Sequence, residues 1–293
     1  MSKRIAFIGL GLMGTPMASN LVAAGYRVKG YDPTGVYPKN VTPCESTRLA
    51  VQDADMVILM VPDGKIVRDV LLGEDGPAPF IDANSLIVDM SSSHPTGTKE
   101  LGTILRDRGL AFIDAPVSGG VKKAEAGNLA IMVGGDTANF ERVKPMLEIL
   151  GEQIFHVGDL GAGHATKALN NLLSAVGLIA SMEVVAAAQK SGIDPRKFLE
   201  VINASTGRNN TTEIKMEPHV LNRAFASGFG LSLMVKDITT AMDYAQSFGM
   251  DMSACKEAVK IAVEADAELS SGADHTEVAK LVENKAGLKL GKP

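Results

Sequence analysis

A glycine-rich turn near the N-terminus constrains this 293-residue chain more than any other feature. The turn reads Gly9-Leu10-Gly11-Leu12-Met13-Gly14. It follows the apolar, strand-like residues 4–8 directly and leads into a helical pattern over residues 16–24. Gly9 permits a tight turn, Gly11 lets the backbone approach a pyrophosphate, and Gly14 allows close helix packing, as in dinucleotide-binding turns. The alternative is an ordinary strand-to-helix turn.

Asp32 supports the dinucleotide interpretation. It ends the strand-like residues 27–32, at the spacing of roughly 20 residues expected of a carboxylate that binds the adenosine ribose. A carboxylate repels a 2′-phosphate, and residues 33–35 offer no guanidinium to receive one. The sequence therefore favours NAD over NADP, with Lys39 as the nearest downstream cation. The alternative role for Asp32 is that of a turn residue before Pro33.

Short apolar segments alternate with helical patterns through the first half of the chain. The strand candidates are residues 4–8, 27–32, 55–61, 85–89, 111–114, 130–133 and 153–157. This alternation predicts a mostly parallel sheet with helices on both faces. Ligands of such sheets bind beyond the carboxyl ends of the strands. The residues at the ends of the third and fourth strands therefore belong to the predicted nucleotide site. They are Val61-Pro62-Asp63 and Ser91-Ser92-Ser93.

The pattern changes after residue 158, where helical segments follow one another without alternating strands. These segments are residues 161–192, 195–204, 231–249 and 253–269. The chain is thus predicted to have an α/β fold, with a doubly wound, Rossmann-type N-terminal domain (1–160) followed by an all-α C-terminal domain (161–293). A glycine cluster at 158–163 marks the boundary. Residues 287–293 are expected to form a loose basic tail.

Composition narrows the functional class. The formal net charge of −5 provides no broad basic field, which argues against nucleic acid as a partner and favours a small molecule. No apolar run reaches the roughly 20 residues that span a bilayer, so we expect a cytoplasmic protein that does not bind membranes. Cys44 and Cys255 suit a reducing compartment. The five histidines, His164 among them, form no ligand pair, so no metal is predicted and each is expected to be a surface or capping residue.

A second glycine turn, Ser118-Gly119-Gly120, follows the strand candidate 111–114. Consecutive backbone amides in such a turn form a small anion-binding concavity, and the Ser118 hydroxyl adds a further donor. This predicts a site for a substrate carboxylate. The alternative is a plain turn between two strands of the sheet.

Lys167 and Asn171 lie near the start of the helical segment 161–192, and their spacing of four residues places them on one helix face. The apolar neighbours of Lys167 predict a mostly buried helix, with Lys167 facing a crevice between the domains. These neighbours are Ala165, Ala168, Leu169, Leu172 and Leu173. Such a lysine can exchange a proton near neutral pH if burial or nearby positive charge lowers its pKa. The pair is our candidate catalytic centre, and the alternative for Lys167 is an ordinary surface lysine.

Four segments resemble the signatures of the β-hydroxyacid dehydrogenases, and most closely their 3-hydroxyisobutyrate dehydrogenase-like members. They are residues 9–14, 114–127, 161–171 and 236–237, in the family's order along nearly the whole chain. The resemblance implies a dehydrogenase that uses NAD and acts on a small 3-hydroxy acid or the matching semialdehyde. It also implies that the helical domain serves substrate binding and oligomerisation, commonly as a homodimer or homotetramer.

The resemblance also assigns roles to individual residues. It implies that Lys167 is the catalytic lysine, with Asn171 as its partner at the substrate hydroxyl. Ser118, Gly119 and Gly120 are implied to bind the substrate carboxylate, Pro62 and Ser92 to line the NAD cleft, and Lys236 to contact the cofactor. The loop at residues 205–212 is implied to reach the active site, so that Arg208, Asn209 and Asn210 read the distal end of the substrate. An ordinary solvated loop is the alternative.

Several activities remain open. Within the enzymes, the rivals are tartronate semialdehyde reductase and L-threonate or 4-hydroxybutyrate dehydrogenase. Imine reductases resemble this pattern but usually lack the lysine. A 6-phosphogluconate dehydrogenase would need a longer helical region and a basic cluster for the phosphate. From another class, a non-catalytic NAD-binding redox sensor also fits the sequence.

Overall fold

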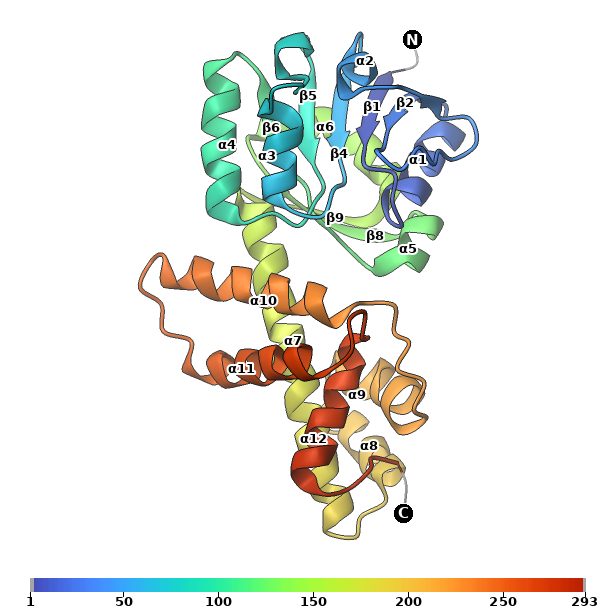
Figure 1. Ribbon diagram of the computed structural model, residues 1–293, viewed down its shortest axis with the longest axis vertical. Coiled ribbons are helices and arrows are strands. Elements are labelled where there is room, and N and C mark those ends of the chain that lie inside the picture. The colour runs from blue at the N-terminus through green and yellow to red at the C-terminus, as the bar shows by residue number, and fades with distance from the viewer. Residues whose placement is uncertain (1–2, 292–293) are drawn as a thin grey trace. The chain divides into compact units, whose positions relative to one another are not determined.

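The computed structural model describes residues 3–291 (Figure 1). Its chain divides into two compact units, Met1–Lys167 and Ala168–Pro293. The long helix α7 (Ala162–Lys190) begins directly after the glycine cluster in which the sequence places a domain boundary. Because α7 continues unbroken beyond residue 167, the first unit includes the opening turns of this helix.

The first unit is built on one twisted sheet. Its strands are β1 (Arg4–Ile8), β2 (Arg27–Tyr31), β3 (Thr42–Pro43), β4 (Met56–Leu59), β5 (Leu86–Asp89), β6 (Ala111–Asp114), β7 (Val117–Ser118), β8 (Leu129–Gly134) and β9 (Gly151–Gly158). They lie in the order β3-β2-β1-β4-β5-β6-β8-β7, with β9 also pairing with β8. Strands β1 to β6 are parallel to one another, as in the doubly wound dinucleotide-binding fold.

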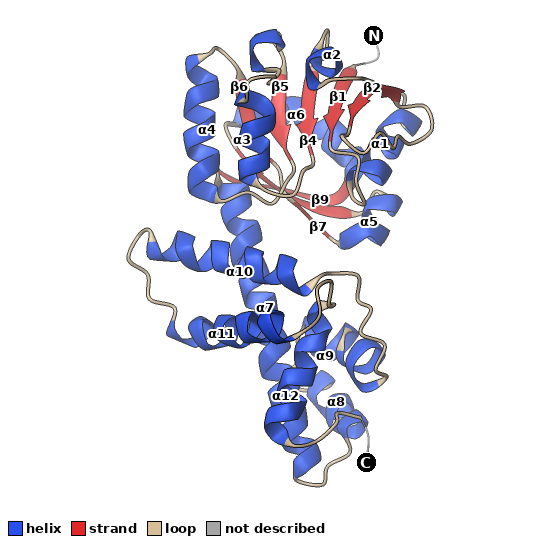
Figure 2. Ribbon diagram, in the orientation of Figure 1, coloured by secondary structure: helices blue, strands red, loops and turns tan. Residues whose placement is uncertain are grey.

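Helices cover both faces of this sheet (Figure 2). One face carries α1 (Gly14–Ala23), α5 (Gly120–Ala126) and α6 (Thr137–Leu150), and the other carries α2 (Thr47–Val51), α3 (Gly64–Leu72) and α4 (Pro95–Asp107). Side chains alternate along each strand, so Ile5 and Phe7 belong to the first core, while Ala6 and Ile8 belong to the second. The predicted two-sided burial is confirmed.

All seven predicted strands are present, with ends that differ by at most two residues. Strands β3 and β7, which have only two residues each, were not predicted. The mostly parallel sheet is confirmed, and its exceptions are the antiparallel pairs of β8 with β6 and with β7.

The second unit is helical. It contains most of α7 together with α8 (Pro195–Asn203), α9 (Asn210–Ile214), the π-helical segment η2 (Met216–Leu221), α10 (Leu231–Gln246), α11 (Ser253–Glu268), η3 (His275–Glu277) and α12 (Val278–Ala286). Its core gathers buried side chains of α7, α10, α11 and α12, among them Leu178, Met182, Ile238 and Val278. The four predicted helices are confirmed, whereas α9, η2 and α12 were not anticipated.

Within residues 3–291, α7 alone is long and apolar enough to cross a membrane by length and composition, with a mean hydropathy of 1.7 in the window tested. The expectation from the sequence concerned unbroken apolar runs of about 20 residues, and α7 is not such a run, because polar residues such as Asn171 and Glu183 interrupt it. Half of that window is buried inside the structure, at 50%. A core helix of a soluble protein passes the same test, so α7 is weak evidence for a membrane span.

The prediction of a loose tail over residues 287–293 was wrong for residues 287–291, which the structure describes. Leu290 is fully buried, and its backbone N–H donates to Glu283 Oε1 at 2.8 Å. Gln189 holds the same segment from both sides, because its amide donates to Lys289 O at 2.9 Å and accepts from Gly291 N at 3.0 Å. The final two residues of the predicted tail lie outside the described residues.

Candidate active site

The glycine turn lies at the carboxyl end of β1, between β1 and α1. Gly9 has a positive φ of 95°, and its N–H donates to Tyr31 O at 3.0 Å. A Cβ at Gly9 would overlap Met60 O, and a Cβ at Gly14 would overlap Gly9 O. These two glycines are therefore required by the packing of the protein itself.

Gly11 differs from its two neighbours in the motif. A Cβ built at Gly11 would meet no atom within 4 Å, and its φ is not positive, so the protein imposes no need for glycine there. The adjoining Leu12 is 81% exposed, and Met13 precedes the first residue of α1. An open turn at a helix N-terminus fits a phosphate group that comes close to the backbone.

Asp32 is buried beside this turn. Its Oδ2 accepts from Leu10 N at 2.7 Å, and its Oδ1 accepts from the backbone N–H and hydroxyl of Thr34 at 2.9 and 2.5 Å. Burial alone would raise the pKa of Asp32, but the hydrogen bonds from Thr34 and Leu10 outweigh it and lower the pKa below its ordinary value. Asp32 thus acts as a turn residue, since it accepts hydrogen bonds from Thr34. It also provides a fixed negative charge beside the glycine turn, as the dinucleotide interpretation requires.

The next two parallel strands end at the same edge. Val61 follows β4 and donates its N–H to Ser91 Oγ at 3.0 Å, which ties it to the turn after β5. Pro62 is exposed and Ser92 is half-buried in the same two turns. The structure thus places all three predicted residues at the carboxyl ends of neighbouring strands, where the glycine turn also lies.

The second glycine turn joins β7 to α5. Ser118 ends β7 half-buried, while Gly119 and Gly120 are exposed. Both glycines have positive φ angles, 138° and 71°, which disfavour any other residue. The backbone therefore requires this pair whether or not the turn binds an anion.

A buried carboxylate anchors the start of α7. Asp114, the last residue of β6, accepts from Gly161 N through Oδ1 and from His164 N through Oδ2, both at 2.7 Å. A Cβ at Gly163 would lie 2.8 Å from Oδ2, and a Cβ at Gly134 would overlap Oδ1. The two glycines make room for Asp114, which caps α7 from the neighbouring sheet.

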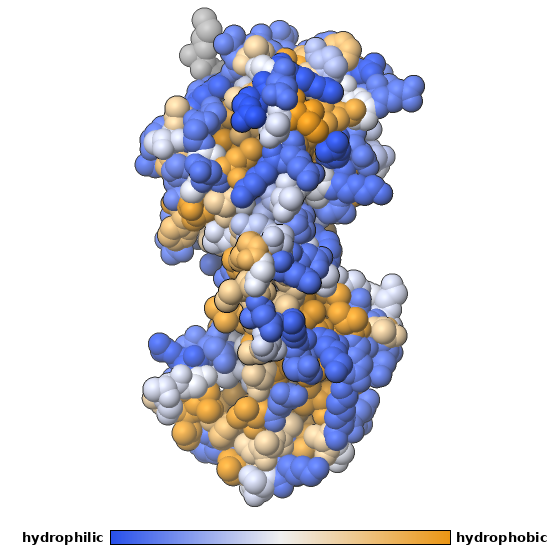
Figure 3. Space-filling view, turned by 90° about the vertical axis from the view of Figure 1, so that its left-hand side faces the viewer, coloured by the Kyte–Doolittle hydropathy of each residue, from blue (hydrophilic) through white to orange (hydrophobic). Residues whose placement is uncertain are grey.

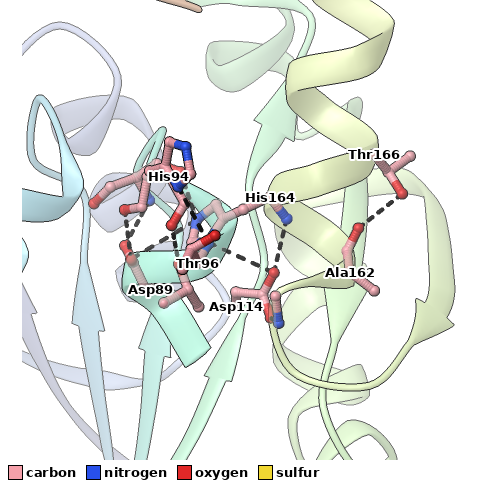
Figure 4. A network of polar contacts seen from close by, with 11 residues as sticks. Asp89, His94, Thr96, Asp114, Ala162, His164 and Thr166 are labelled. Carbon is pink, nitrogen blue, oxygen red and sulfur yellow. Dashed lines mark hydrogen bonds and ion pairs between the residues drawn. The ribbon is translucent and has the colours of Figure 1, made fainter. Parts of the chain in front are cut away.

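His164 lies inside this network (Figure 4). It is 1% exposed, with Nδ1 at 2.8 Å from Thr98 Oγ1, Nε2 at 3.1 Å from Ser91 O, and Asp89 Oδ2 at 3.7 Å from Nε2. The expectation of a surface or capping histidine was therefore wrong for His164, and it was also wrong for His275, which is 4% exposed. That expectation came from the absence of a ligand pair among the histidines, and spacing along the chain carries no information about tertiary burial.

Lys167 is half-buried in the second turn of α7. Ala165 and Ala168 beside it are buried, but Leu169 is 39% exposed and Leu173 is 73% exposed. Leu172 is buried at 2%, so the predicted burial of this part of α7 is confirmed for one side of the helix and was wrong for the side that carries the two exposed leucines. The apolar character of α7 therefore continues onto the surface of the single chain.

Asn171 lies one turn further along α7, in the second unit. Its Nδ2 donates to Asp237 Oδ2 at 2.7 Å. The other oxygen of Asp237 lies 3.3 Å from Lys236 Nζ, and Asp237 itself is 7% exposed. Asn171 and Lys236 are thus connected through a carboxylate that the sequence analysis named only as part of a motif.

The loop before α9, which was predicted to reach the substrate, contains a residue that stabilises the fold. Asn209 caps α9, because its Oδ1 accepts from Thr211 N at 2.8 Å, and its amide donates to Ser181 Oγ at 3.0 Å. Arg208 is exposed and lies 3.6 Å from Glu213. The carbonyl oxygen and the amide nitrogen of the Asn209 side chain therefore both form hydrogen bonds within the protein, whereas the Arg208 side chain lies on the surface.

No group of three or more His, Cys, Asp and Glu side chains among residues 3–291 is arranged to hold a metal ion. The carboxyl edge of the sheet instead brings together the glycine turn at residues 9–14, the carboxylate of Asp32 and the turns that follow β4 and β5. This set fits the phosphates and ribose of a dinucleotide.

The fold and the glycine turn are those of a dinucleotide-binding protein, and the comparisons narrow this class to the oxidoreductases. The family described as the NAD-binding domain of 6-phosphogluconate dehydrogenase matches residues 4–158. The family described as "NAD-binding of NADP-dependent 3-hydroxyisobutyrate dehydrogenase" matches residues 161–282. The chain belongs to the β-hydroxyacid dehydrogenase family, which confirms the resemblance.

Similar proteins match over most of the chain. A 2-(hydroxymethyl)glutarate dehydrogenase of Eubacterium barkeri is 38% identical over 83% of this chain and 82% of its own length. A 3-hydroxyisobutyrate dehydrogenase of Pseudomonas aeruginosa is 35% identical over 96% and 99%. The structure of Mycobacterium tuberculosis 3-hydroxyisobutyrate dehydrogenase with L-serine superposes with a TM-score of 0.89 at 35% identity, covering 96% of this chain and 99% of that one. These relatives are named as dehydrogenases, and this chain is an enzyme of that family.

Sequence reasoning missed the burial of three polar groups near the candidate site residues, Asp114, His164 and Asp237. All three lie within or next to the recognised motifs. Polar residues inside otherwise apolar segments were the available signal, because a buried charge must find hydrogen-bond partners.

Proposed function

We propose that this protein transfers a hydride between NAD and a small 3-hydroxy acid, of the 3-hydroxyisobutyrate kind, or its semialdehyde. The observation that carries the proposal is the open turn at Gly11 beside the fixed carboxylate of Asp32, in a chain that also carries Lys167 and Asn171 on one face of α7. A non-catalytic sensor would need the first feature but not the second.

Lys167 is the proposed acid–base group. Oxidation of the carbinol carbon requires the hydroxyl proton to leave as the hydride leaves, and a positioned amine can take it. In the reverse direction the protonated amine donates to the developing alkoxide. The bound nicotinamide supplies the hydride-transfer chemistry. Asn171 is proposed to hold the substrate oxygen that exchanges this proton.

The remaining contacts concern substrate recognition. The backbone amides of Gly119 and Gly120, with the Ser118 hydroxyl, are proposed to bind the carboxylate, because both glycines are exposed and consecutive amides in such a turn suit an anion. Arg208 is the proposed reader of the distal end. Asn209 is not retained in that role, because its side chain caps α9.

Cofactor choice follows from Asp32. Its carboxylate is held ionised by three hydrogen bonds and would repel a 2′-phosphate, so NAD is proposed as the preferred cofactor. Val61, Pro62 and Ser92 are proposed to line the cofactor site, and Lys236 to contact the cofactor.

A homo-oligomer in the cytoplasm is proposed as the working form. The second unit exposes large apolar side chains, including Leu173 at 73%, Val201 at 61% and Phe248 at 61%. Figure 3 shows apolar patches on the visible face of this unit. Exposed apolar surface of this kind is typical of subunit interfaces. Sedimentation equilibrium at several protein concentrations tests this, and a monomer throughout would contradict it.

The function is tested by incubating the purified protein with NAD and, separately, with NADP, and following NADH or NADPH absorbance. The acids are 3-hydroxyisobutyrate, glycerate, L-threonate, 4-hydroxybutyrate, 2-(hydroxymethyl)glutarate and L-serine. Turnover with a 3-hydroxy acid and NAD is expected. NAD binding by calorimetry without turnover of any acid, or of the matching semialdehydes with NADH, would favour the sensor.

A further inference from the structure

We propose that Asp237 is a positioning residue for catalysis, which acts by fixing the carboxamide of Asn171. This inference rests on the proposed function, because it assumes that Asn171 contacts the substrate. Both residues belong to the helical unit, one on α7 and the other on α10.

The two oxygens of Asp237 have different partners. Oδ2 accepts from Asn171 Nδ2 at 2.7 Å, and Oδ1 lies 3.3 Å from Lys236 Nζ. With 7% of Asp237 exposed, few contacts with water compete for these oxygens. A charged acceptor with little solvent access makes a stronger hydrogen bond than a neutral one.

This contact determines which way the carboxamide of Asn171 faces. A carboxylate can only accept hydrogen bonds, so the amide nitrogen of Asn171, and not its oxygen, must lie against Asp237. The carbonyl oxygen then faces the other way, where Asn170 Nδ2 is 3.4 Å distant. The remaining N–H and the carbonyl oxygen of Asn171 thereby acquire a fixed direction.

A fixed direction matters because a hydrogen-bonding group aids hydride and proton transfer only when it is aligned with the reacting oxygen. Without Asp237, the carboxamide of Asn171 can rotate or turn over, and both orientations become available. Asp237 need not touch the substrate to influence the rate.

The variants Asp237→Ala, Asn171→Ala and the double variant form a cycle that tests the inference. They are assayed with the best acid from the activity screen. Asp237→Ala is expected to lower kcat by about 10- to 100-fold, the loss typical of a misplaced catalytic group. In the Asn171→Ala background, the same change is expected to cost less than about twofold, because Asp237 then has nothing to orient. A purely structural role would lower kcat equally in both backgrounds, and that result would overturn the inference.

Asp237→Asn provides a second route in case the alanine variant does not fold. It preserves the shape and an acceptor oxygen, but its amide lets Asn171 bind in either orientation. An intermediate kcat is therefore expected, and a kcat equal to that of the unaltered enzyme would contradict the proposed orienting role of the charge. Asp243→Ala, an exposed carboxylate on the same helix, is the matched control and should not change kcat.

The result separates this inference from the proposed function. An unaltered enzyme that turns over none of the acids overturns the proposed function, and this inference with it. An active enzyme whose two single substitutions have additive effects overturns only the role of Asp237.

Discussion

Asp114 caps the helix that contains His164, from a strand of the neighbouring sheet. The carboxylate accepts from His164 N at 2.7 Å, and the imidazole of His164 lies in the same buried network as Asp89. The helix that carries Lys167 is therefore joined to the sheet at its first turn by hydrogen bonds, in addition to packing.

Asp114→Ala should destabilise the first unit. It leaves the buried N–H groups of Gly161 and His164 without acceptors, at a cost of roughly 1–3 kcal/mol for each unpaired group. Urea unfolding measures this loss. Asp136→Ala, which removes the exposed cap of α6, is a suitable comparison and should cost only about 1 kcal/mol. Equal losses would contradict the anchoring role.

Gly11→Ala should weaken cofactor binding without weakening the fold. A Cβ there meets no protein atom within 4 Å, but it would project where the pyrophosphate is proposed to approach. The Kd for NAD, measured by calorimetry, should rise about tenfold or more, which corresponds to about 1.4 kcal/mol. Thermal unfolding of the unliganded protein should stay unchanged. Unaltered NAD affinity would remove the turn from the cofactor site.

Lys167→Ala should lower kcat by about two to four orders of magnitude while leaving the Kd for NAD nearly intact. Lys167→Arg retains the positive charge but cannot release a proton near neutral pH, so it should be similarly inactive. The measurement is steady-state kinetics together with NAD titration. Parallel loss of turnover and NAD affinity would instead indicate a structural lysine.

His275 should make stability depend on pH. Burial, and then the positive charge of Lys215, lower the pKa of His275 from 6.5 to about 4. The unfolded chain therefore binds more protons than the folded one between these values, and stability falls as pH decreases through this window. His275 alone should cost about 2 kcal/mol between pH 7.5 and pH 5.

Urea unfolding of the unaltered protein and of His275→Gln at both pH values isolates this contribution. The variant should lose less stability on acidification, by about the same 2 kcal/mol. Equal pH dependence in the two proteins would show that His275 does not remain neutral when folded.

Asp32→Ala should reduce the preference for NAD over NADP, since the anion that repels a 2′-phosphate is removed. It should also destabilise the protein by about 1–3 kcal/mol, because the buried Leu10 N–H loses its acceptor. The ratio of kcat/KM for the two cofactors checks the first effect, and urea unfolding checks the second. An unchanged ratio would exclude Asp32 from cofactor selection.

The parts of the fold that follow local periodicity were predictable. The alternation of apolar segments predicted the seven longer strands, and the glycine turn predicted the start of the doubly wound sheet. The two-residue strands β3 and β7 were not predictable, because so short a segment has no period and forms only where a neighbour pairs with it.

Spacing along the chain predicted the local placement of some candidate residues, namely Gly11 in the turn before α1 and Lys167 and Asn171 one turn apart on α7, while their roles stay predictions. The burial of His164 and the contact between Asn171 and Asp237 were not predictable in this way. Asn171 and Asp237 are far apart in sequence, and their contact depends on how α7 and α10 pack. The exposure of Leu173 was also missed, because an apolar sequence does not distinguish a core from an unpaired surface.

Asp32 accepts a hydrogen bond from Leu10 N and is also the residue proposed to select the cofactor, and this combination has a consequence for redesign. Replacing Asp32 to admit a cofactor with a 2′-phosphate would also remove the acceptor of the Leu10 N–H, which holds the glycine turn in place. An engineer who wants NADP in place of NAD must therefore install two things at once: a cation for the added phosphate and a substitute partner for the Leu10 amide. In the proposed site, cofactor preference and the conformation of the glycine turn therefore depend on the same residue.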